Sequence, residues 1–395
     1  MRHHSLTKRT QMLGATGIAL AATLLLTSCG TNAADAEHDK LKVVATTTQL
    51  TDFATQVGGN DAEVTGLLPA GGSAHHFDPT PADLLALGQA DVLVVNGANL
   101  ESFLDSAVEA SGFDGVVITA ADGIDLAEAK RITAEGEDEA SGIAAAAAAE
   151  ADEHDHDHDH DHDHADDHDH DHVDEANHDH AEHADEAAGE TATDHDGHDH
   201  GDTNPHLWTA PRYAEGMVSE IADGFAQADP EHAANYTKRG AEYIATLTEL
   251  DRWAAGQFAA VPEADRVLVS GHDSLRYFLH DYEIGFAGAI LPSFEDNAEP
   301  SAAQIDALVE QIHARGVQAI FVESSMSPKL AKTIAREANV TVVDDTALYA
   351  DSLGAAGSGA ESYVGATVHN TRAIIEAWGG SVTDPPAAVD AAMEG

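Results

Sequence analysis

The chain has 395 residues, with 18 Lys and Arg against 71 Asp and Glu, and a formal net charge of −53. Such an acidic chain excludes a polybasic nucleic-acid binder, so no nucleic acid is expected as a partner. A single cysteine excludes an intramolecular disulfide framework and any zinc site built from several thiolates. A metal ion would therefore have to be held by nitrogen and oxygen atoms.

Residues 1–28 predict a secretory signal peptide. A positively charged start precedes an apolar stretch at residues 12–26, which is short for a membrane span. The following Leu-Thr-Ser-Cys resembles the lipobox of bacterial lipoproteins, which implies that Cys29 becomes the lipidated first residue of the mature chain. Residues 29–40 would then form a tether. The mature protein is expected to be extracytoplasmic and lipid-anchored to the cell membrane, although a signal anchor ending in a chance cysteine is the alternative.

Two series of short apolar segments predict an α/β fold of two lobes. The first series lies in residues 41–230, with strands at 41–47, 64–68, 90–95 and 115–119 and a helix at 81–87. The second lies in residues 261–395, with strands at 267–269, 284–290, 317–322 and 340–343 and helices at 300–314, 328–338 and 361–378. Buried strands that alternate with helices indicate a parallel sheet flanked by helices in each lobe.

A long helical pattern connects the two lobes. It runs from Pro211 to about residue 260, is interrupted near Asp229 and Pro230, and continues as a linking helix at residues 231–260. Because a continuous helix lacks the loop residues that absorb hinge rotations, we expect this helix to be rigid and the lobes not to swing freely.

Residues 150–203 form a His/Asp-rich insertion within the first lobe. The segment contains 23 Asp and Glu, 15 of the 26 His and no Lys or Arg. Because it has no aromatic residue and few branched apolar ones, it predicts a disordered loop. One interpretation is a solvated polyelectrolyte. The other is a zinc collector, with the alternating histidines as auxiliary ligands: His154, His156, His158, His160, His162, His164, His168, His170, His172, His198 and His200.

Three of the remaining histidines lie on loops that could reach the carboxyl edge of a parallel sheet, where ligands bind in such folds. His75 follows the second strand, His206 precedes a helix where the chain regains order, and His272 follows the strand at 267–269. Neutral imidazole is the commonest ligand of zinc, and three imidazoles need a fourth donor to close a tetrahedral site. Asp351, in the loop after the last strand, is the candidate, although it could also be an ordinary loop or helix-cap carboxylate. His232, His280, His313 and His369 fall on or beside helices and are expected to be solvated or structural.

Five motifs in the same order resemble the solute-binding lipoproteins of zinc and manganese ABC importers. They are Gly71 to Pro81 with His75-His76-Phe77-Asp78-Pro79, Asn204-Pro205-His206-Leu207-Trp208, Ser270-Gly271-His272-Asp273-Ser274, Glu299-Pro300-Ser301 and Tyr349-Ala350-Asp351-Ser352-Leu353-Gly354. The resemblance covers nearly all of residues 41–380. It departs from the family at Ser73-Ala74, where the family commonly has Asp-Pro.

The resemblance implies that His75, His206, His272 and Asp351 hold the metal ion. The third of these positions is histidine in members that look like zinc carriers and tends to be glutamate in manganese carriers, so His272 implies zinc rather than manganese. Members of the zinc branch often carry a histidine-rich acidic loop in the place of residues 150–203. The implied function is to capture Zn²⁺ and deliver it, as a monomer, to the membrane subunit of an ABC permease without catalysis.

Three other functions remain open from the residues. A manganese importer component would differ only in its cargo, and a zinc buffer or adhesin would share the metal site. A zinc hydrolase is disfavoured because four protein ligands leave no position for water and no His-Glu-x-x-His pair is present.

Overall fold

The computed structural model describes residues 40–73, 75, 77–136, 203–291, 293 and 299–393. The predicted signal peptide, Cys29 and the tether before residue 40 lie outside the described residues. So do His76 and all of the His/Asp-rich insertion except Thr203, which is buried.

The N-terminal lobe contains a four-stranded parallel sheet of order β2-β1-β3-β4. Its strands are β1 (Leu41–Ala45), β2 (Ala62–Gly66), β3 (Val92–Val95) and β4 (Val116–Thr119). Alternate residues of the central strands enter two different cores. Val43 and Val92 face α1 (Thr48–Gly58), whereas Val44 and Leu93 face α2 (Pro81–Leu87) and α3 (Leu104–Ser111). Because both of its faces are covered, the central strand β3 is a continuous buried apolar run, Val-Leu-Val-Val.

The C-terminal lobe repeats this arrangement with a parallel sheet of order β6-β5-β7-β8. Its strands are β5 (Val267–Ser270), β6 (Gly285–Ala289), β7 (Ala319–Glu323) and β8 (Thr341–Leu348). One face is covered by α8 (Ala302–Ala314) and α9 (Pro328–Ala338), and α7 (Arg276–Asp281) follows β5. Ser301 starts α8 with a capping box, and a proline at the first turn starts α9.

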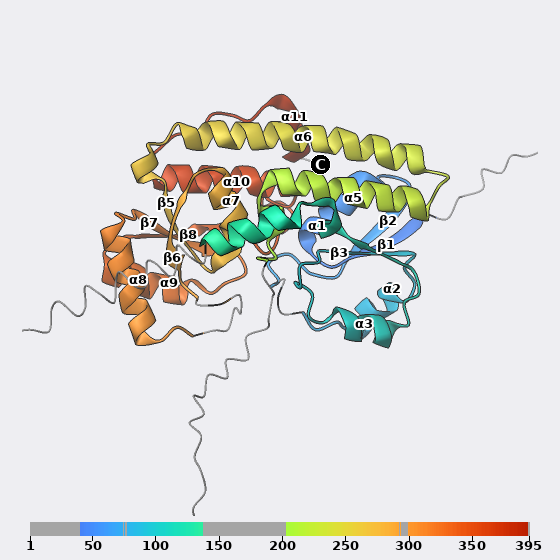
Figure 1. The fold of residues 1–395 in the computed structure, drawn as a ribbon, viewed down its shortest axis with the longest axis horizontal. Helices are drawn as coiled ribbons and strands as arrows, with labels where there is room; N and C mark the ends of the chain where they lie inside the picture. The colour runs from blue at the N-terminus through green and yellow to red at the C-terminus, as the bar shows by residue number, and fades with distance from the viewer. Residues whose placement is uncertain are drawn as a thin grey trace, which may run out of the picture. The chain divides into compact units, whose positions relative to one another are not determined.

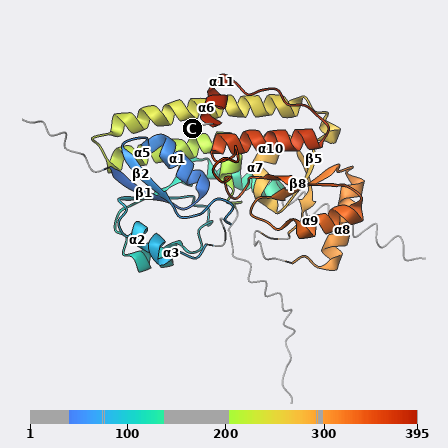
Figure 2. The same cartoon turned by 180° about the vertical axis from the view of Figure 1, so that it is seen from behind.

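Long helices join the two lobes along one side, as Figures 1 and 2 show. The helix α5 (Pro211–Ala228) ends at Asp229 and packs against α6 (Ala233–Ala259), so the predicted interruption is confirmed. The helix α6 contacts α1 in the N-terminal lobe and also α10 (Tyr363–Ala377) and α11 (Ala387–Met393) in the C-terminal part. One hydrophobic core includes Phe53, Leu247 and Ile374, so the lobes share buried apolar contacts. The fold is the predicted pair of parallel sheets flanked by helices.

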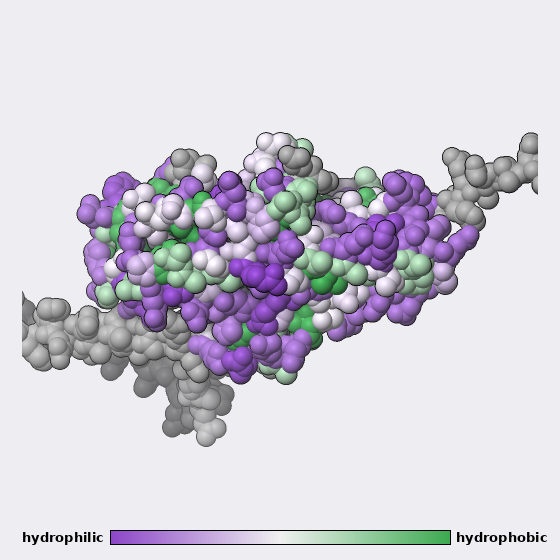
Figure 3. Space-filling view, turned by 90° about the horizontal axis from the view of Figure 1, so that it is seen from above, coloured by the Kyte–Doolittle hydropathy of each residue, from purple (hydrophilic) through white to green (hydrophobic). Residues whose placement is uncertain are grey.

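Figure 3 shows the molecule from above the view of Figure 1. On this face, small apolar groups are scattered among hydrophilic residues. Such scattered apolar residues are normal for a face in contact with water. Among the described residues, no helix combines the length and the apolar character needed to cross a membrane.

Candidate metal centre

The structure brings together the four side chains that the sequence predicts as ligands. His75, His206, His272 and Asp351 each offer one donor atom, and these atoms all lie within 4.8 Å of one another. The four side chains are buried, with at most 5 % of any residue exposed. Four donor atoms that converge in one buried site can hold a common metal cation.

Each side chain is delivered by a loop at the end of a regular element. His75 lies in the loop between β2 and α2, and His206 immediately precedes a 3₁₀ turn at Leu207–Thr209 that leads into α5. His272 follows β5, and Asp351 follows β8. Three of the four therefore come from segments that follow strands, as expected for ligand sites in parallel α/β sheets.

The three imidazoles approach one another and Asp351 through their Nε2 atoms. His206 Nε2 lies 2.9 Å from His75 Nε2 and 3.2 Å from His272 Nε2. Asp351 Oδ1 lies 3.3 Å from the Nε2 atoms of both His206 and His272. These are hydrogen-bond distances when a proton lies between two of the atoms. Where the facing atoms all present lone pairs, a cation among them turns repulsion into attraction.

Neighbouring oxygens determine which ring nitrogen of two histidines faces the centre. His206 Nδ1 lies 2.7 Å from Asn204 Oδ1, whose amide nitrogen donates to the Asp273 carbonyl. His272 Nδ1 lies 3.2 Å from Glu323 Oε2. An oxygen acceptor favours a proton on Nδ1, so the neutral ring presents the lone pair of Nε2 to the other donors, as in metal-ligating histidines. The donor set therefore fits a metal cation.

The loop that carries Asp351 is fixed from both lobes. The Ala350 carbonyl accepts hydrogen bonds from Gln49 Nε2 at 3.0 Å and Trp208 Nε1 at 2.7 Å. Asp351 Oδ2 accepts a hydrogen bond from Ser325 Oγ at 3.2 Å. These contacts leave Oδ1 directed toward His206 and His272.

The charges of the site shift two pKa values strongly. Burial lowers the pKa of His272, but the carboxylates of Glu323 and Asp351 outweigh it and raise this pKa well above the ordinary value. Burial raises the pKa of Asp351, but His272 and His206 outweigh it and hold this pKa well below its usual range. In the absence of a metal ion, the site therefore attracts a proton, and a divalent cation would have to displace it.

The sequence motifs predict the four converging side chains but not their outer partners. Asn204 lies in one of these motifs without a predicted role, and Glu323 directly follows the predicted strand 317–322. A charged residue that ends a continuous buried strand was the available signal, because a buried carboxylate needs a partner.

The other described histidines lie away from this cluster. His232 contacts Asp229, His280 contacts Asp281, His313 contacts the Ala338 carbonyl and His369 contacts the Ala347 carbonyl. These contacts agree with the structural roles expected from their places on or beside helices.

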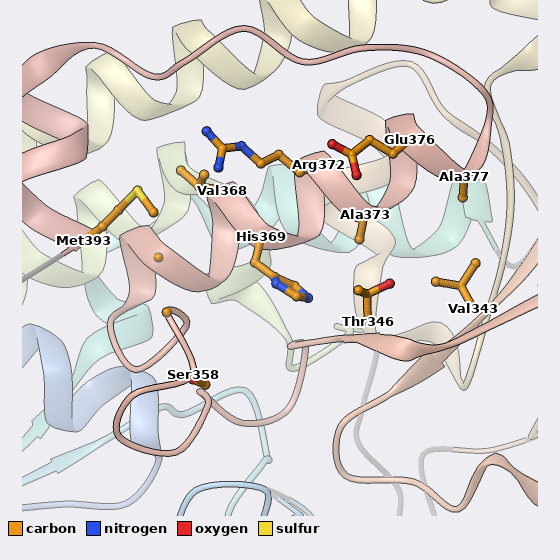
Figure 4. Close-up of a pocket in the computed structure, with 12 residues that line it drawn as sticks. Val343, Thr346, Ser358, Val368, His369, Arg372, Ala373, Glu376, Ala377 and Met393 are labelled. Carbon is orange, nitrogen blue, oxygen red and sulfur yellow. The ribbon is translucent and has the colours of Figure 1, made fainter.

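A separate surface pocket of about 460 Å³ lies against α10 and β8 (Figure 4). His369, Arg372 and Glu376 line it from α10, and Val343 and Thr346 line it from β8. None of the four predicted ligands is among its lining residues, so this pocket is distinct from the metal centre.

Comparison with known proteins places the chain in a family. Residues 43–377 match the family described as ZnuA, zinc-uptake complex component A, periplasmic. The manganese-binding lipoprotein MntA of Bacillus subtilis is 28 % identical over 362 residues, which cover 91 % of this chain and 96 % of the relative. The manganese ABC transporter substrate-binding lipoprotein PsaA of Streptococcus pneumoniae is 24 % identical over 367 residues, which cover 91 % and 95 %.

A solved structure has the same fold. The periplasmic zinc-binding protein TroA of Treponema pallidum aligns with a TM-score of 0.63 and 21 % identity, covering 86 % of this chain and 99 % of that one. The names of these relatives include both manganese and zinc, so similarity alone leaves the metal open. The match over most of its length shows that the chain belongs to the ZnuA family of metal ABC transporter substrate-binding proteins.

Proposed function

We propose that this protein captures Zn²⁺ outside the cytoplasmic membrane and delivers it to the membrane subunit of an ABC permease. The observation that carries the proposal is the buried convergence of His75, His206, His272 and Asp351 within 4.8 Å. The protein would act as a monomer held to the membrane through a lipid on Cys29.

Zinc is favoured over manganese by the composition of the donor set. Three imidazole nitrogens with one carboxylate suit zinc, whereas manganese prefers a larger share of oxygen ligands. Mn²⁺ is the second candidate because the relatives MntA and PsaA are named for manganese. The difference between these cargoes would lie at His272, the position at which the manganese branch tends to have glutamate.

Capture without catalysis follows from the same geometry. A catalytic zinc ion keeps an open position for water and has a nearby general base. Four protein donors would instead complete a tetrahedral shell and exclude water, which suits a carrier. A zinc buffer or adhesin would have the same shell, and a deletion strain without any zinc-limited growth defect would favour that alternative.

Ligand exchange would use local motion of loops. The helix α6 contacts elements of both lobes and the lobes share one core, so a large swing would break buried apolar contacts. Release would require displacement of one of the ligand loops, which docking on the permease could provide if the permease binds the displaced state more tightly.

The histidines of the insertion form a second part of the proposal. We propose that they bind zinc ions loosely and raise the local supply to the tight site. Each ion would have to order a chain segment, whereas the folded site is preorganised and binds more tightly.

The test of the main proposal is metal content and affinity. Protein purified without added metal should carry one equivalent of zinc, and chelator-competition titration should show one tight site. His272→Ala should weaken this site by on the order of 100-fold or more, because loss of a ligand costs more than the 10–100-fold typical of an outer partner. His313→Ala is the matched control, since this histidine contacts only a helix carbonyl among the hydrogen bonds described. Unchanged affinity in the His272 variant would remove this residue from the site.

A further inference from the structure

Glu323 is a buried carboxylate directly behind one of the proposed ligands. It ends β7, a central strand of the C-terminal sheet, and only 1 % of its surface is exposed. Its Oε1 accepts a hydrogen bond from the His272 backbone N–H at 3.0 Å. Its Oε2 accepts one from Ser274 Oγ at 3.0 Å and lies 3.2 Å from His272 Nδ1. Both oxygens therefore serve the loop that carries His272.

We infer that Glu323 is a positioning residue for metal capture, which holds the His272 ring with its Nδ1 protonated and supplies the second negative charge that balances a buried divalent cation. The inference rests on the proposed function, because it assigns the outer partner of one ligand in the same site.

The positioning part follows from the contacts of the carboxylate. A neutral imidazole carries a proton on only one nitrogen, and an oxygen acceptor beside Nδ1 directs the proton there. Nε2 then offers its lone pair toward His206 and Asp351, which lie 3.2 Å and 3.3 Å away. The second oxygen holds the backbone of the same residue, so the ring and its peptide are fixed by one side chain.

The charge part follows from the donor set. Three neutral imidazoles and Asp351 carry one negative charge, which leaves a divalent ion half balanced in a buried site. Glu323 adds the second negative charge. It lies on the far side of the His272 ring from the proposed metal position, and among the described residues its ion-pair partner is His272. The nearby carboxylate of Asp273 is already paired with Arg276 at 2.8 Å. Because an unbalanced buried charge is costly, we expect the outer carboxylate to strengthen binding.

The backbone at Gly271 leaves space for this carboxylate. A Cβ atom on Gly271 would lie 2.7 Å from Glu323 Oε1 and would also clash with Met326 Sδ. The glycine before His272 is therefore required by the close approach of both the Glu323 carboxylate and Met326 Sδ. The neighbouring Ser270 hydroxyl donates to the His272 carbonyl, which further fixes the turn.

Asn204 and Glu323, the outer partners of His206 and His272, differ in charge. His206 has the neutral acceptor Asn204, whereas His272 has the carboxylate of Glu323. Only the second can contribute to the charge balance. Removing the charge of Glu323 while keeping its shape therefore isolates the inferred role.

The experiment compares the Glu323→Gln variant with the unsubstituted protein, both full-length, in chelator-competition titrations with Zn²⁺. A glutamine has one acceptor oxygen and no charge. It therefore cannot accept from the His272 backbone N–H with one oxygen while its second oxygen faces Ser274 Oγ and His272 Nδ1. We expect zinc affinity to fall by about 10–100-fold. The absorption bands of one equivalent of Co²⁺ should also shift, because the electron donation of the His272 ring changes.

Glu101→Gln is the matched control. Glu101 also accepts internal hydrogen bonds, from Thr46 Oγ1 at 2.7 Å and from the backbone of Asn96 at 2.6 Å, but it lies in the N-terminal lobe and contacts none of the four proposed ligands in the bonds described. It should lose stability without a change in zinc affinity or in the Co²⁺ spectrum. Equal losses of affinity in both variants would overturn the inference, since they would reflect a general effect of replacing a hydrogen-bonded glutamate with glutamine.

A second variant keeps the charge and moves the carboxylate. Gly271→Ala should displace Glu323 and weaken zinc binding in the same direction, which tests the inference if Glu323→Gln does not fold. Unchanged zinc affinity in the Glu323 or Gly271 variant, with a severe loss in His272→Ala, would overturn the inference and leave the proposed function intact. Unchanged affinity in all three would overturn both.

Discussion

At the scale of single residues, the orientation of His206 and His272 depends on the residues that contact their Nδ1 atoms. Asn204 and Glu323 face the Nδ1 atoms of His206 and His272, so both rings direct Nε2 toward Asp351. The loops that carry Asp351 and His272 are held by internal hydrogen bonds to Gln49, Trp208 and Glu323. Such preorganisation reduces the ordering cost of binding and favours a tight site.

The identity of the residue at position 272 should control the preference of the site for Zn²⁺ over Mn²⁺. The H272E variant replaces one of three nitrogens with an oxygen, so the preference for Zn²⁺ over Mn²⁺ should fall by about tenfold or more. The new carboxylate would lie beside Glu323, and repulsion between the two should weaken both metals. The double variant H272E/E323Q removes that repulsion and is the matched comparison. The ratio of the two dissociation constants, measured by competition titration, checks the expectation, and an unchanged ratio in both variants would refute it.

The convergence of the four proposed ligands could be predicted from the sequence and its family resemblance, whereas their outer partners could not. His75, His206, His272 and Asp351 lie in motifs on loops next to apolar strands, and these local patterns are visible in one chain. The pairing of Glu323 with His272 spans 51 residues and depends on the register of β7 beside β5, which has no local signature. Asn204 is similar, because its amide nitrogen reaches the Asp273 carbonyl 69 residues away.

At the scale of elements, the turn between α5 and α6 is held by a small charged network. Asp229 caps the C-terminus of α5. It accepts a hydrogen bond from Tyr236 Oη at 2.8 Å, and its carboxylate lies 2.7 Å from His232 Nδ1. Arg239 pairs with Asp61 at 2.9 Å and donates to the carbonyl of Val57, which ties α6 to the end of α1. The start of the linking helix is therefore fixed to the N-terminal lobe.

The stability of this turn should depend on pH. The hydrogen bond to Asp229 raises the pKa of His232 above its ordinary value. A raised folded pKa means that the protonated form stabilises the fold below the unfolded pKa, and that this stabilisation is lost as the pH rises through the folded pKa. His232→Ala should therefore lower Tm at about pH 5 more than at about pH 9.

Thermal unfolding of the metal-free protein at both pH values is the measurement. Asp229→Asn should give the same pH dependence, since it removes the other partner of the pair. An equal decrease in Tm at the two pH values would contradict the prediction, because it would show that protonation of His232 does not stabilise the fold.

At the scale of the whole molecule, the chain combines a shared core and a folded metal site with an acidic insertion sequence rich in histidine. Residues of α1, α6 and α10 belong to one hydrophobic cluster, so the two sheets are held together by buried contacts. The alternation of strands and helices makes the two sheets predictable. The extension of β8 to Leu348 is not predictable, because Asp344, Asp345 and Thr346 interrupt the apolar run and favour a loop.

The insertion should bind zinc separately from the folded site. Deleting residues 150–200 should remove the zinc bound above one equivalent and leave the one tight equivalent, because only the folded site is preorganised. The deletion stops before Thr203, which is buried and adjoins Asn204. A matched control replaces the histidines of the same segment with asparagine at constant length. Zinc stoichiometry that is unchanged by both variants would refute the collector role.

Anomalous diffraction at the zinc edge, from crystals grown with one equivalent of Zn²⁺, tests the central claim most directly. The account predicts one strong peak about 2.0–2.2 Å from the Nε2 atoms of His75, His206 and His272 and from an oxygen of Asp351. A peak bound by other residues, with these four side chains in place and no ion among them, would contradict it.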